Sequence, residues 1–360
     1  MHPQQHHPTL DHNSARRNGI TRAGPGKPLA VTALLVAGLL AGCGTNTPSQ
    51  NEPGSDLPPP AEPATAPPLS ANPAGQQIPV GQSPEGVVAD PVTHLVAVGV
   101  RKPDDLVLLD ENTGQIVNRV ALPGHLRHLQ LAKPGGPVLV PDENSNALLT
   151  VSLPAGAITS RVVTGISPHD ATAAGNGLVF AANEGGASVA VVLDNAVVHQ
   201  FTDVVQPAGL AAVGDLVGLV DVRQNQLHVY DAAALTPLAT LNAGNGPTHV
   251  VADKRGHLAV IDTRGNQVLF YQVTPTVKQI GRLALPGTPY GVAYDPVRDR
   301  LWVTLTGLNQ LVGVDASGAT PQVVTRLPTV RQPNTVAVDD ATGKLFVTGT
   351  DAGVLQVISS

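Results

Sequence analysis

The sequence contains little cysteine, few aromatic residues and few charges. Its 360 residues include one Cys, one Trp, four Tyr and four Phe, and only 13% are charged. A single thiol excludes a disulfide within the chain and a zinc site built from several cysteines. The formal net charge of −6 and the scarcity of stacking aromatics exclude a nucleic-acid partner, which calls for a basic surface. No apolar run approaches the roughly 20 residues that a membrane-spanning helix requires.

The N-terminal 43 residues have the pattern of an export signal. A cationic stretch precedes an uncharged run over residues 29–40, and the chain's cysteine follows directly. Leu40-Ala41-Gly42-Cys43 resembles the bacterial lipobox, in which the cysteine thiol receives a lipid and the chain is cleaved just before it. We therefore predict a lipoprotein signal peptide over residues 1–42, lipidation of Cys43, and anchoring at the extracytoplasmic face of the cell membrane. An ordinary secretory signal with a chance cysteine is the alternative, and Arg16-Arg17 leaves the choice between Sec and twin-arginine export open.

The next segment is rich in proline. Residues 44–74 carry nine prolines among Ser, Thr, Asn and Ala, with almost no large apolar side chains. Such a composition cannot bury enough surface to fold on its own. We therefore predict that residues 43–74, beginning with the lipidated cysteine, form a disordered linker that holds the folded domain away from the lipid.

From about residue 75 onward the sequence repeats itself. Seven equivalent segments start at positions 84, 126, 168, 207, 247, 289 and 333, spaced 39 to 44 residues apart. Two further apolar stretches follow in each unit after polar turns, and most units end in a fourth, such as residues 116–120 and 158–163. The stretches are short, β-branched and bounded by Gly, Asn and Asp, which is typical of strands. The repeat therefore predicts four-stranded units, seven in number.

The seventh unit has no fourth stretch before Ser360, whereas residues 75–80 form an orphan strand ahead of the first unit. If that strand completes the last sheet, the chain closes into a ring and leaves no free edge between its first and last units. We therefore predict an all-β fold over residues 75–360, a seven-bladed β-propeller closed by an N-terminal strand that completes the last blade.

Three features recur in the repeats. They are openings of the form Pro-x-Gly-Val-Ala, strands such as Leu345-Phe-Val-Thr-Gly, and Asp-Pro or Asp-Asp pairs that end the first strand, namely Asp90-Pro91, Asp295-Pro296 and Asp339-Asp340. On these features residues 75–360 resemble the YVTN or YncE-like propeller family. The resemblance implies an exported protein and no particular reaction, because the fold also hosts lactonases and quinone-dependent dehydrogenases. The quinoprotein pattern of tryptophans is absent, since Trp302 is the only one.

In a propeller, the starts of the innermost strands and the turns between second and third strands surround one mouth of the central channel. Ligands usually bind there. The turns contribute carboxylates, among them Glu143 and Glu184. The starts contribute the candidate ligand-binding residues, which are Glu85, Arg127, His128, His169, Asp170, His249, Tyr290 and Asn334.

A divalent metal is one interpretation of this mouth, because imidazole and carboxylate groups are the donors that zinc and manganese prefer. The weak candidate ligands are His128, Asp170 and His249. Polar lining of a water-filled channel, which the sequence favours, and a pocket for a non-metal ligand are the alternatives. No nucleophile elbow, Walker loop, His-Glu-x-x-His or dinucleotide motif is present.

Together these features favour a membrane-anchored lipoprotein whose propeller is a binding or scaffold module of the cell envelope. Its expected partners are the membrane, through Cys43, and an envelope protein, peptide or glycan; no cofactor is expected. The alternative is a metal-dependent hydrolase or lactonase-like enzyme with its site at the same mouth, so the question of catalysis stays open.

Overall fold

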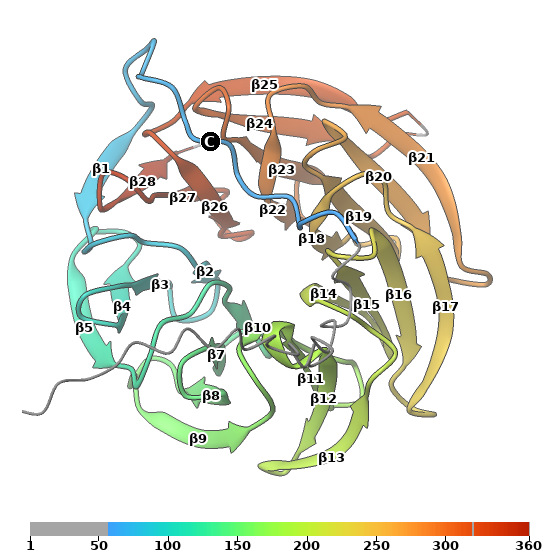
Figure 1. Ribbon diagram of the computed structural model, residues 1–360. Coiled ribbons are helices and arrows are strands. Elements are labelled where there is room, and N and C mark those ends of the chain that lie inside the picture. The colour runs from blue at the N-terminus through green and yellow to red at the C-terminus, as the bar shows by residue number, and fades with distance from the viewer. Residues whose placement is uncertain (1–56, 319, 360) are drawn as a thin grey trace, which may run out of the picture. The chain divides into compact units, whose positions relative to one another are not determined.

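Seven four-stranded antiparallel sheets surround a central axis in the computed structural model, which describes residues 57–318 and 320–359 (Figure 1). In each sheet, called a blade below, the chain runs from the innermost strand outward, except in the last blade. A single turn of 3₁₀ helix, η1 (Glu184–Gly186), follows β11, and the described residues contain no α-helix. The predicted all-β, seven-bladed propeller is confirmed.

The strands of the blades are as follows. Blade 1 contains β2 (Val87–Asp90), β3 (Leu95–Val100), β4 (Asp105–Asp110) and β5 (Ile116–Ala121); blade 2 contains β6 (Gln130–Leu131), β7 (Val138–Asp142), β8 (Ala147–Val151) and β9 (Ile158–Val163); blade 3 contains β10 (Pro168–Ala173), β11 (Val179–Asn183), β12 (Ser188–Leu193) and β13 (Ala196–Phe201); blade 4 contains β14 (Pro207–Val213), β15 (Leu216–Asp221), β16 (Gln226–Asp231) and β17 (Thr236–Asn242); blade 5 contains β18 (Pro247–Ala252), β19 (His257–Asp262), β20 (Gln267–Gln272) and β21 (Lys278–Ala284); blade 6 contains β22 (Pro289–Asp295), β23 (Arg300–Leu305), β24 (Gln310–Asp315) and β25 (Gln322–Pro328); blade 7 contains β26 (Pro333–Val338), β27 (Leu345–Gly349), β28 (Val354–Ile358) and β1 (Gln76–Pro79).

Blade 7 is completed from the other end of the chain. β1 pairs antiparallel with β28, with Gln76 opposite Val357 and Pro79 opposite Val354. Val80, directly after β1, is fully buried in an apolar cluster formed by blades 7 and 1. The predicted closing strand is therefore confirmed, and the contact between blades 7 and 1 is called the seam below.

The core lies between neighbouring blades. Middle strands such as β3 are buried along their whole length, whereas the outer strand β5 is mostly exposed. Continuous apolar strands suit sheets that are packed on both faces. The inner strands converge so closely that a Cβ on Gly291 would overlap the carbonyl oxygen of Asn334 in the next blade. The Pro-x-Gly openings therefore reflect close packing around the axis.

The acidic residues after the innermost strands form turns. The Asp90 carboxylate accepts hydrogen bonds from the backbone N–H groups of Thr93 (3.0 Å) and, in the next blade, Gly135 (2.7 Å). Asp295 and Asp339 accept backbone N–H groups in the corresponding turns of blades 6 and 7. Because these buried carboxylates are satisfied by backbone donors, the repeated motif serves the fold.

Residues 57–68, called the strap below, lie against the propeller, which corrects the prediction of a disordered linker for this part of residues 43–74. The strap crosses the face of blades 5, 6 and 7 (Figure 1). Two of its own residues, Ala61 and Ala66, are buried against the propeller. An extended proline-rich backbone makes no hydrogen bonds with itself, so its amides and carbonyls are available to side chains of the propeller.

Side chains of three blades bind the strap backbone. Arg264 donates to the carbonyl of Pro59 (2.8 Å), and the Thr306 hydroxyl accepts the N–H of Ala64 (3.0 Å). Gln332 donates to the carbonyl of Ala64 and accepts the N–H of Ala66, both at 2.9 Å. Asn309 and Arg331 donate to the carbonyls of Pro67 and Ala66. Composition alone missed this segment because its partners lie more than 200 residues away in sequence.

The predicted signal peptide, the lipobox residues Leu40, Ala41 and Gly42, and Cys43 lie outside the described residues. Across the part of the chain that is described, no helix has the length and apolar character that crossing a bilayer demands.

Candidate functional site

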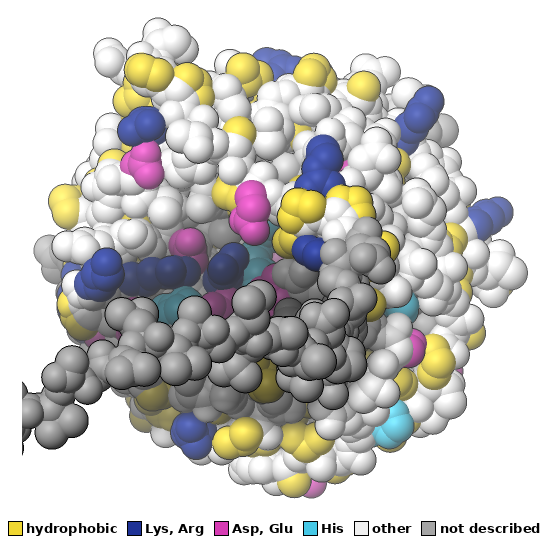
Figure 2. All heavy atoms as spheres, in the orientation of Figure 1, with side chains coloured by type: hydrophobic (Ala, Val, Ile, Leu, Met, Phe, Trp, Pro, Cys, Tyr) yellow, Lys and Arg dark blue, Asp and Glu magenta, His cyan; other side chains and the backbone are white. Residues whose placement is uncertain are grey.

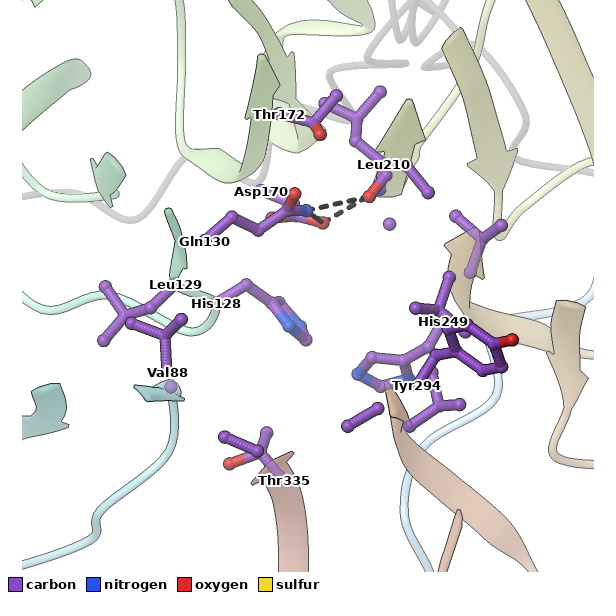
Figure 3. Close-up of a pocket in the computed structure, with 18 of the residues that line it drawn as sticks. Val88, His128, Leu129, Gln130, Asp170, Thr172, Leu210, His249, Tyr294 and Thr335 are labelled. Atoms are coloured by element: carbon purple, nitrogen blue, oxygen red, sulfur yellow. Dashed lines mark hydrogen bonds between the residues drawn. The ribbon is translucent and has the colours of Figure 1, made fainter. Parts of the chain in front are cut away.

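A cavity of about 380 Å³ follows the axis of the ring. Inner strands of all seven blades line it, largely with small and apolar side chains such as Val88, Leu129 and Leu210. Figure 3 shows His128 and His249 directed into this space, His249 from β18 and His128 from the segment before β6. Two imidazoles therefore join the polar side chains of Gln130, Asp170, Thr172 and Thr335 in a wall that also contains many small apolar residues.

Aromatic rings from four blades gather at one end of the cavity, where the inner strands start. The ring of His128 lies 4.7 Å from that of His169 and 4.7 Å from that of His249, measured between centroids. The ring of Tyr290 lies 4.5 Å from that of His249. The structure thus brings together four of the predicted mouth residues, because each is the second or third residue of its repeat, at the start of its blade.

His128 and His249 are neutral at pH 7. Burial, with some repulsion from His169, lowers the pKa of His249 to about 3. Burial and the two neighbouring histidines hold the pKa of His128 well below its usual range. Within the described chain, neither ring nitrogen of His249 has a hydrogen-bond partner, although the residue is only 7% exposed. The cavity therefore presents uncharged imidazole nitrogens that are open to a partner.

His169 instead forms a buried ion pair. Its Nδ1 lies 2.8 Å from Glu184 Oε2, and Gln206 donates to Glu184 Oε1 at 2.8 Å. Burial alone would lower the pKa of His169, but the Glu184 carboxylate outweighs burial and raises it. Burial would raise the pKa of Glu184, yet His169, Gln206 and Arg127 together lower it to about 2.

A second ion pair lies beside the first. Arg127 Nε is 3.0 Å from Glu143 Oε1, and His125 Nε2 is 2.7 Å from Glu143 Oε2. The two pairs meet where His169 Nδ1 approaches Glu143 Oε1 at 3.9 Å. We call Arg127, Glu143, His169 and Glu184 the mouth cluster. Its two basic and two acidic side chains balance in charge.

Asp170 lies in the channel wall, where it joins three blades. Its carboxylate accepts hydrogen bonds from the backbone N–H of Leu210 (2.8 Å) and Ala171 (2.8 Å) and from the side chain of Gln130 (3.0 Å; Figure 3). Burial raises the pKa of Asp170 to about 6 against the effect of these hydrogen bonds. Its oxygens are engaged in packing blades 2, 3 and 4 together.

The weak candidate metal ligands His128, Asp170 and His249 are not among the groups with metal-ligand spacing that the described residues form. The Asp170 carboxylate is bonded within the channel wall, Oδ1 to the N–H of Ala171 and Oδ2 to the N–H of Leu210. Metal-ligand spacing is found instead in the mouth cluster, where donor atoms of Glu143, His169 and Glu184 all lie within 4.8 Å of one another.

Glu85 and Asn334 have partners of their own. Glu85 forms an ion pair with Arg101 (2.6 Å) in blade 1. The Asn334 side-chain carbonyl accepts a hydrogen bond from Gln332 (3.1 Å), the residue that binds the strap. Both predicted residues therefore support the neighbouring structure.

The strap covers the mouth from outside. Residues 60–62 lie over His169, His249 and Tyr290, with a residual gap of only about 20 Å³. Burial and the carboxylate of Glu62 raise the pKa of Tyr290. Figure 2 shows basic, acidic and histidine side chains gathered in the hollow at the centre of this face. The strap thus borders the mouth beside His169, His249 and Tyr290, while Arg127 of the mouth cluster remains 38% exposed.

Glu143 and Glu184 complete the site, although the sequence identified them only as turn residues. Each directly follows a buried polar residue at the end of a second strand, Asp142 or Asn183. That position faces the mouth in every blade, so the repeat alignment contained the signal. Their basic partners Arg127 and His169 were predicted as mouth residues, but the pairing of each carboxylate with its partner depends on distances between side chains that the alignment does not give.

No family model matches the sequence, and no curated protein matches it. Solved structures do resemble the fold. They include hydrazine synthase from Kuenenia stuttgartiensis (15% identity, 81% of this chain and 99% of that chain, TM-score 0.68), a streptogramin B lyase (14%, 79% and 96%, TM-score 0.65), and virginiamycin B lyase from Staphylococcus aureus (13%, 79% and 98%, TM-score 0.63). At these identities the likeness concerns the fold alone.

Proposed function

We propose that this protein is an exported lipoprotein, anchored through Cys43, whose YncE-like propeller acts as a binding module of the cell envelope. The uncharged run over residues 29–40 before the chain's single cysteine supports the anchor. The repeat motifs support the family. No part of this proposal requires catalysis.

The strap favours one orientation of the propeller on the membrane. Arg264 binds the backbone at Pro59, on the face that carries the channel mouth. Fourteen residues separate Cys43 from Leu57, which span at most about 50 Å when fully extended. A lipid on Cys43 would therefore hold the mouth on the side nearest the membrane.

The unpartnered side chain of His249 is the observation that supports a binding function. Both of its ring nitrogens are buried and lack a partner in the described part of the chain, and it borders the cavity. A buried polar group without a hydrogen bond is unfavourable, so a ligand that supplies one gains binding free energy. Because the imidazoles are neutral and the mouth cluster is balanced in charge, the ligand is an uncharged hydroxyl-bearing molecule. A sugar unit of an envelope glycan fits this description.

The test is a thermal-shift titration of the full chain with N-acetylglucosamine and other neutral envelope sugars. His249→Phe keeps an aromatic ring and removes both nitrogens, so the shift should disappear. His199→Ala, on the outer strand β13, is the matched control and should retain it. The proposal fails if no sugar raises the Tm, or if His249→Phe responds as the unaltered chain does.

The mouth cluster favours a second candidate, a metal-dependent hydrolase. Glu143, His169 and Glu184 have suitable donor atoms within 4.8 Å of one another. A metal there would have to displace Arg127 from Glu143 and the proton that His169 shares with Glu184. Metal-dependent lactone hydrolysis that is lost in Glu184→Gln would establish this candidate, and its absence would leave the binding module.

The anchor has its own test. Cys43→Ser removes the acceptor thiol, so the protein should be released into the medium or remain unprocessed. Fractionation and the apparent mass report the outcome. Retention of the variant in the membrane at its mature size would show that Cys43 is not the anchor.

A further inference from the structure

A second group of histidine and carboxylate side chains lies at the seam, on the face opposite the mouth. It joins turns of the first and last blades: His94 precedes β3, Glu111 follows β4, and Asp339 follows β26. Their donor atoms all lie within 4.8 Å of one another. We call these three residues the seam cluster. It is separate from the channel, because none of its members lines the cavity.

The seam cluster contains buried atoms without partners. Among the described residues, neither carboxylate oxygen of Glu111 nor Nδ1 of His94 has a hydrogen-bond partner. The Glu111 side chain is 0% exposed, and His94 Nδ1 lies 3.2 Å from its Oε1. Lys344 Nζ stays 4.0 Å from the same oxygen and donates instead to the backbone carbonyl of Glu111 (3.1 Å) and to Asn112 (3.0 Å). A buried carboxylate left in this state is strongly unfavourable.

The other blades show that the fold does not need a carboxylate at this position. The N–H of Glu111 donates to the carbonyl of His94 (3.0 Å), and in blade 4 the N–H of Ala232 donates to the carbonyl of Asp215 (2.8 Å) in the same way. Blade 6 has Ala316 at this place, directly after the turn-forming aspartate. Both alanines are buried. Glu111 therefore puts a buried carboxyl group where blades 4 and 6 pack a methyl group.

We propose that His94, Glu111 and Asp339 bind a divalent transition-metal ion, zinc or manganese, which links blade 7 to blade 1. One imidazole and two carboxylates are a donor set that suits these ions. The ion would satisfy both Glu111 oxygens and the His94 nitrogen at once. It would also remove the repulsion between the two carboxylates.

The exposure of His94 and the charges around Glu111 are both consistent with a metal ion bound at the seam cluster. Burial and the nearby Asp339 carboxylate raise the pKa of Glu111, against the effect of Lys344 and His94. The ring of His94 is 46% exposed, which gives an ion a path from solvent. A cavity of about 120 Å³ borders Glu111 and Lys344 and has room for the water molecules that would complete the coordination shell.

Glu111 is the residue to change, because Asp339 also accepts backbone N–H groups in its turn. The full, untagged chain is stripped with EDTA and titrated with Mn²⁺ and Zn²⁺, and bound ions are counted by equilibrium dialysis. Glu111→Ala places in blade 1 the residue that blades 4 and 6 already use, so it should fold and bind one ion fewer. Asp194→Asn, at the corresponding exposed position directly after β12 in blade 3, is the matched control and should keep the seam ion. Histidines 2, 6, 7 and 12 are present in every variant, so any metal ions that they bind are counted equally and do not change the difference in bound ions between variants.

Two results support the proposal: loss of one bound ion in Glu111→Ala, and a metal-induced rise in Tm that the variant lacks. If Glu111→Ala proves insoluble, His94→Asn replaces it, because Asn tolerates the left-handed backbone of this position (φ 56°). Equal binding by the unaltered chain and the Glu111 or His94 variant overturns the proposal. In that case Glu111 and Asp339 share a proton instead of a cation.

Discussion

The mouth cluster and the seam cluster contain the same kinds of side chain and differ in how those side chains are partnered. At the mouth, Glu184 is held by His169 and Gln206 at 2.8 Å each. At the seam, the Glu111 carboxylate accepts no hydrogen bond from the residues that the structure describes. The comparison teaches that donor composition does not define a site. At the mouth both Glu184 oxygens are hydrogen-bonded, whereas at the seam both Glu111 oxygens remain open to a cation.

The position of each cluster follows the same logic. The mouth cluster lies under the strap and beside the channel, where a balanced network can hold the histidines in place. The seam cluster lies where the two ends of the propeller meet, in the turns next to the closing strand's blade. A link between blades is most useful at the seam, because there β26, β27 and β28 are joined to blade 1 through the hydrogen-bonded pairing of β28 with β1 and not by a direct chain connection.

The largest expected effect comes from removing the seam itself. Deletion of residues 75–80 removes β1, exposes the edge of β28 and takes Val80 out of the core. We expect an insoluble protein or loss of the cooperative unfolding transition, measured by circular dichroism. A deletion of the same length at residues 44–49, outside the described residues, is the control. A soluble, cooperatively folded deletion variant would mean that ring closure does not stabilise this propeller.

The fold was predictable from the sequence because the repeat is regular. Each unit places short apolar stretches between Gly, Asn and Asp turns, and counting those stretches gave the blades and the closing strand. The gathering of His128, His169 and His249 was predictable for the same reason, since equivalent positions in a ring converge on its axis. What the alignment could not show is which side chains pair across blades. Asp170 accepts hydrogen bonds from backbone amides, and Glu184 pairs with His169. Both interactions depend on distances in the folded protein that the alignment does not contain.

The strap and the seam cluster were beyond sequence reasoning. A proline-rich segment has the same composition whether it is free or bound, and the hydrogen bonds of Gln332 to Ala64 and Ala66 connect residues more than 260 positions apart. Glu111 follows a turn-forming aspartate and has the sequence context of a solvent-exposed turn. Its burial arises only when blade 7 closes against blade 1.

The second largest effect concerns the partnered cluster. His169→Ala leaves Glu184 buried without its cation, and removal of one partner of a buried ion pair destabilises a protein by about 3–5 kcal/mol. Chemical denaturation at pH 6 measures the change. Ala substitution at His199, which lies on an outer strand, should have little effect. A loss below about 1 kcal/mol would show that the His169–Glu184 pair contributes little to stability.

The same pair predicts a dependence of stability on pH. The pKa of Glu184 falls from 4.5 to about 2, so its contribution of about 3 kcal/mol is present above pH 4.5 and is lost as the pH falls toward 2. The pKa of His169 is raised, so its contribution is present below pH 6.5 and is lost as the pH rises through the folded-state value. Glu184→Gln should flatten both limbs of the profile. A variant profile parallel to that of the unaltered chain would contradict this assignment.

A smaller, local effect is expected at the strap. Gln332→Ala removes two hydrogen bonds to the strap backbone and its bond to Asn334, a loss of about 1–3 kcal/mol. Because the strap is the cover of the mouth, hydrogen exchange at Ala64 and Ala66 should accelerate while the blades stay protected. Gln310→Ala, at the start of β24, is the control. Unchanged exchange at the two alanines would mean that other contacts hold the strap.

The smallest effect separates the two clusters most sharply. With metal removed, Glu111 faces Asp339, Lys344 and His94, and its raised pKa makes its charged form unfavourable in the folded state. The penalty is therefore present at pH 8 and disappears as the pH falls below the ordinary range of a glutamate pKa. Glu111→Gln, which keeps the shape and removes the charge, should be more stable than the unaltered chain at pH 8, by about 1 kcal/mol, and equal to it near pH 4. Glu184→Gln should instead be less stable than the unaltered chain at pH 6, because the Glu184 carboxylate has hydrogen-bond partners that the substitution weakens. If both substitutions destabilise the protein in EDTA, the carboxylate of Glu111 is satisfied without a cation, and the contrast between mouth and seam does not hold.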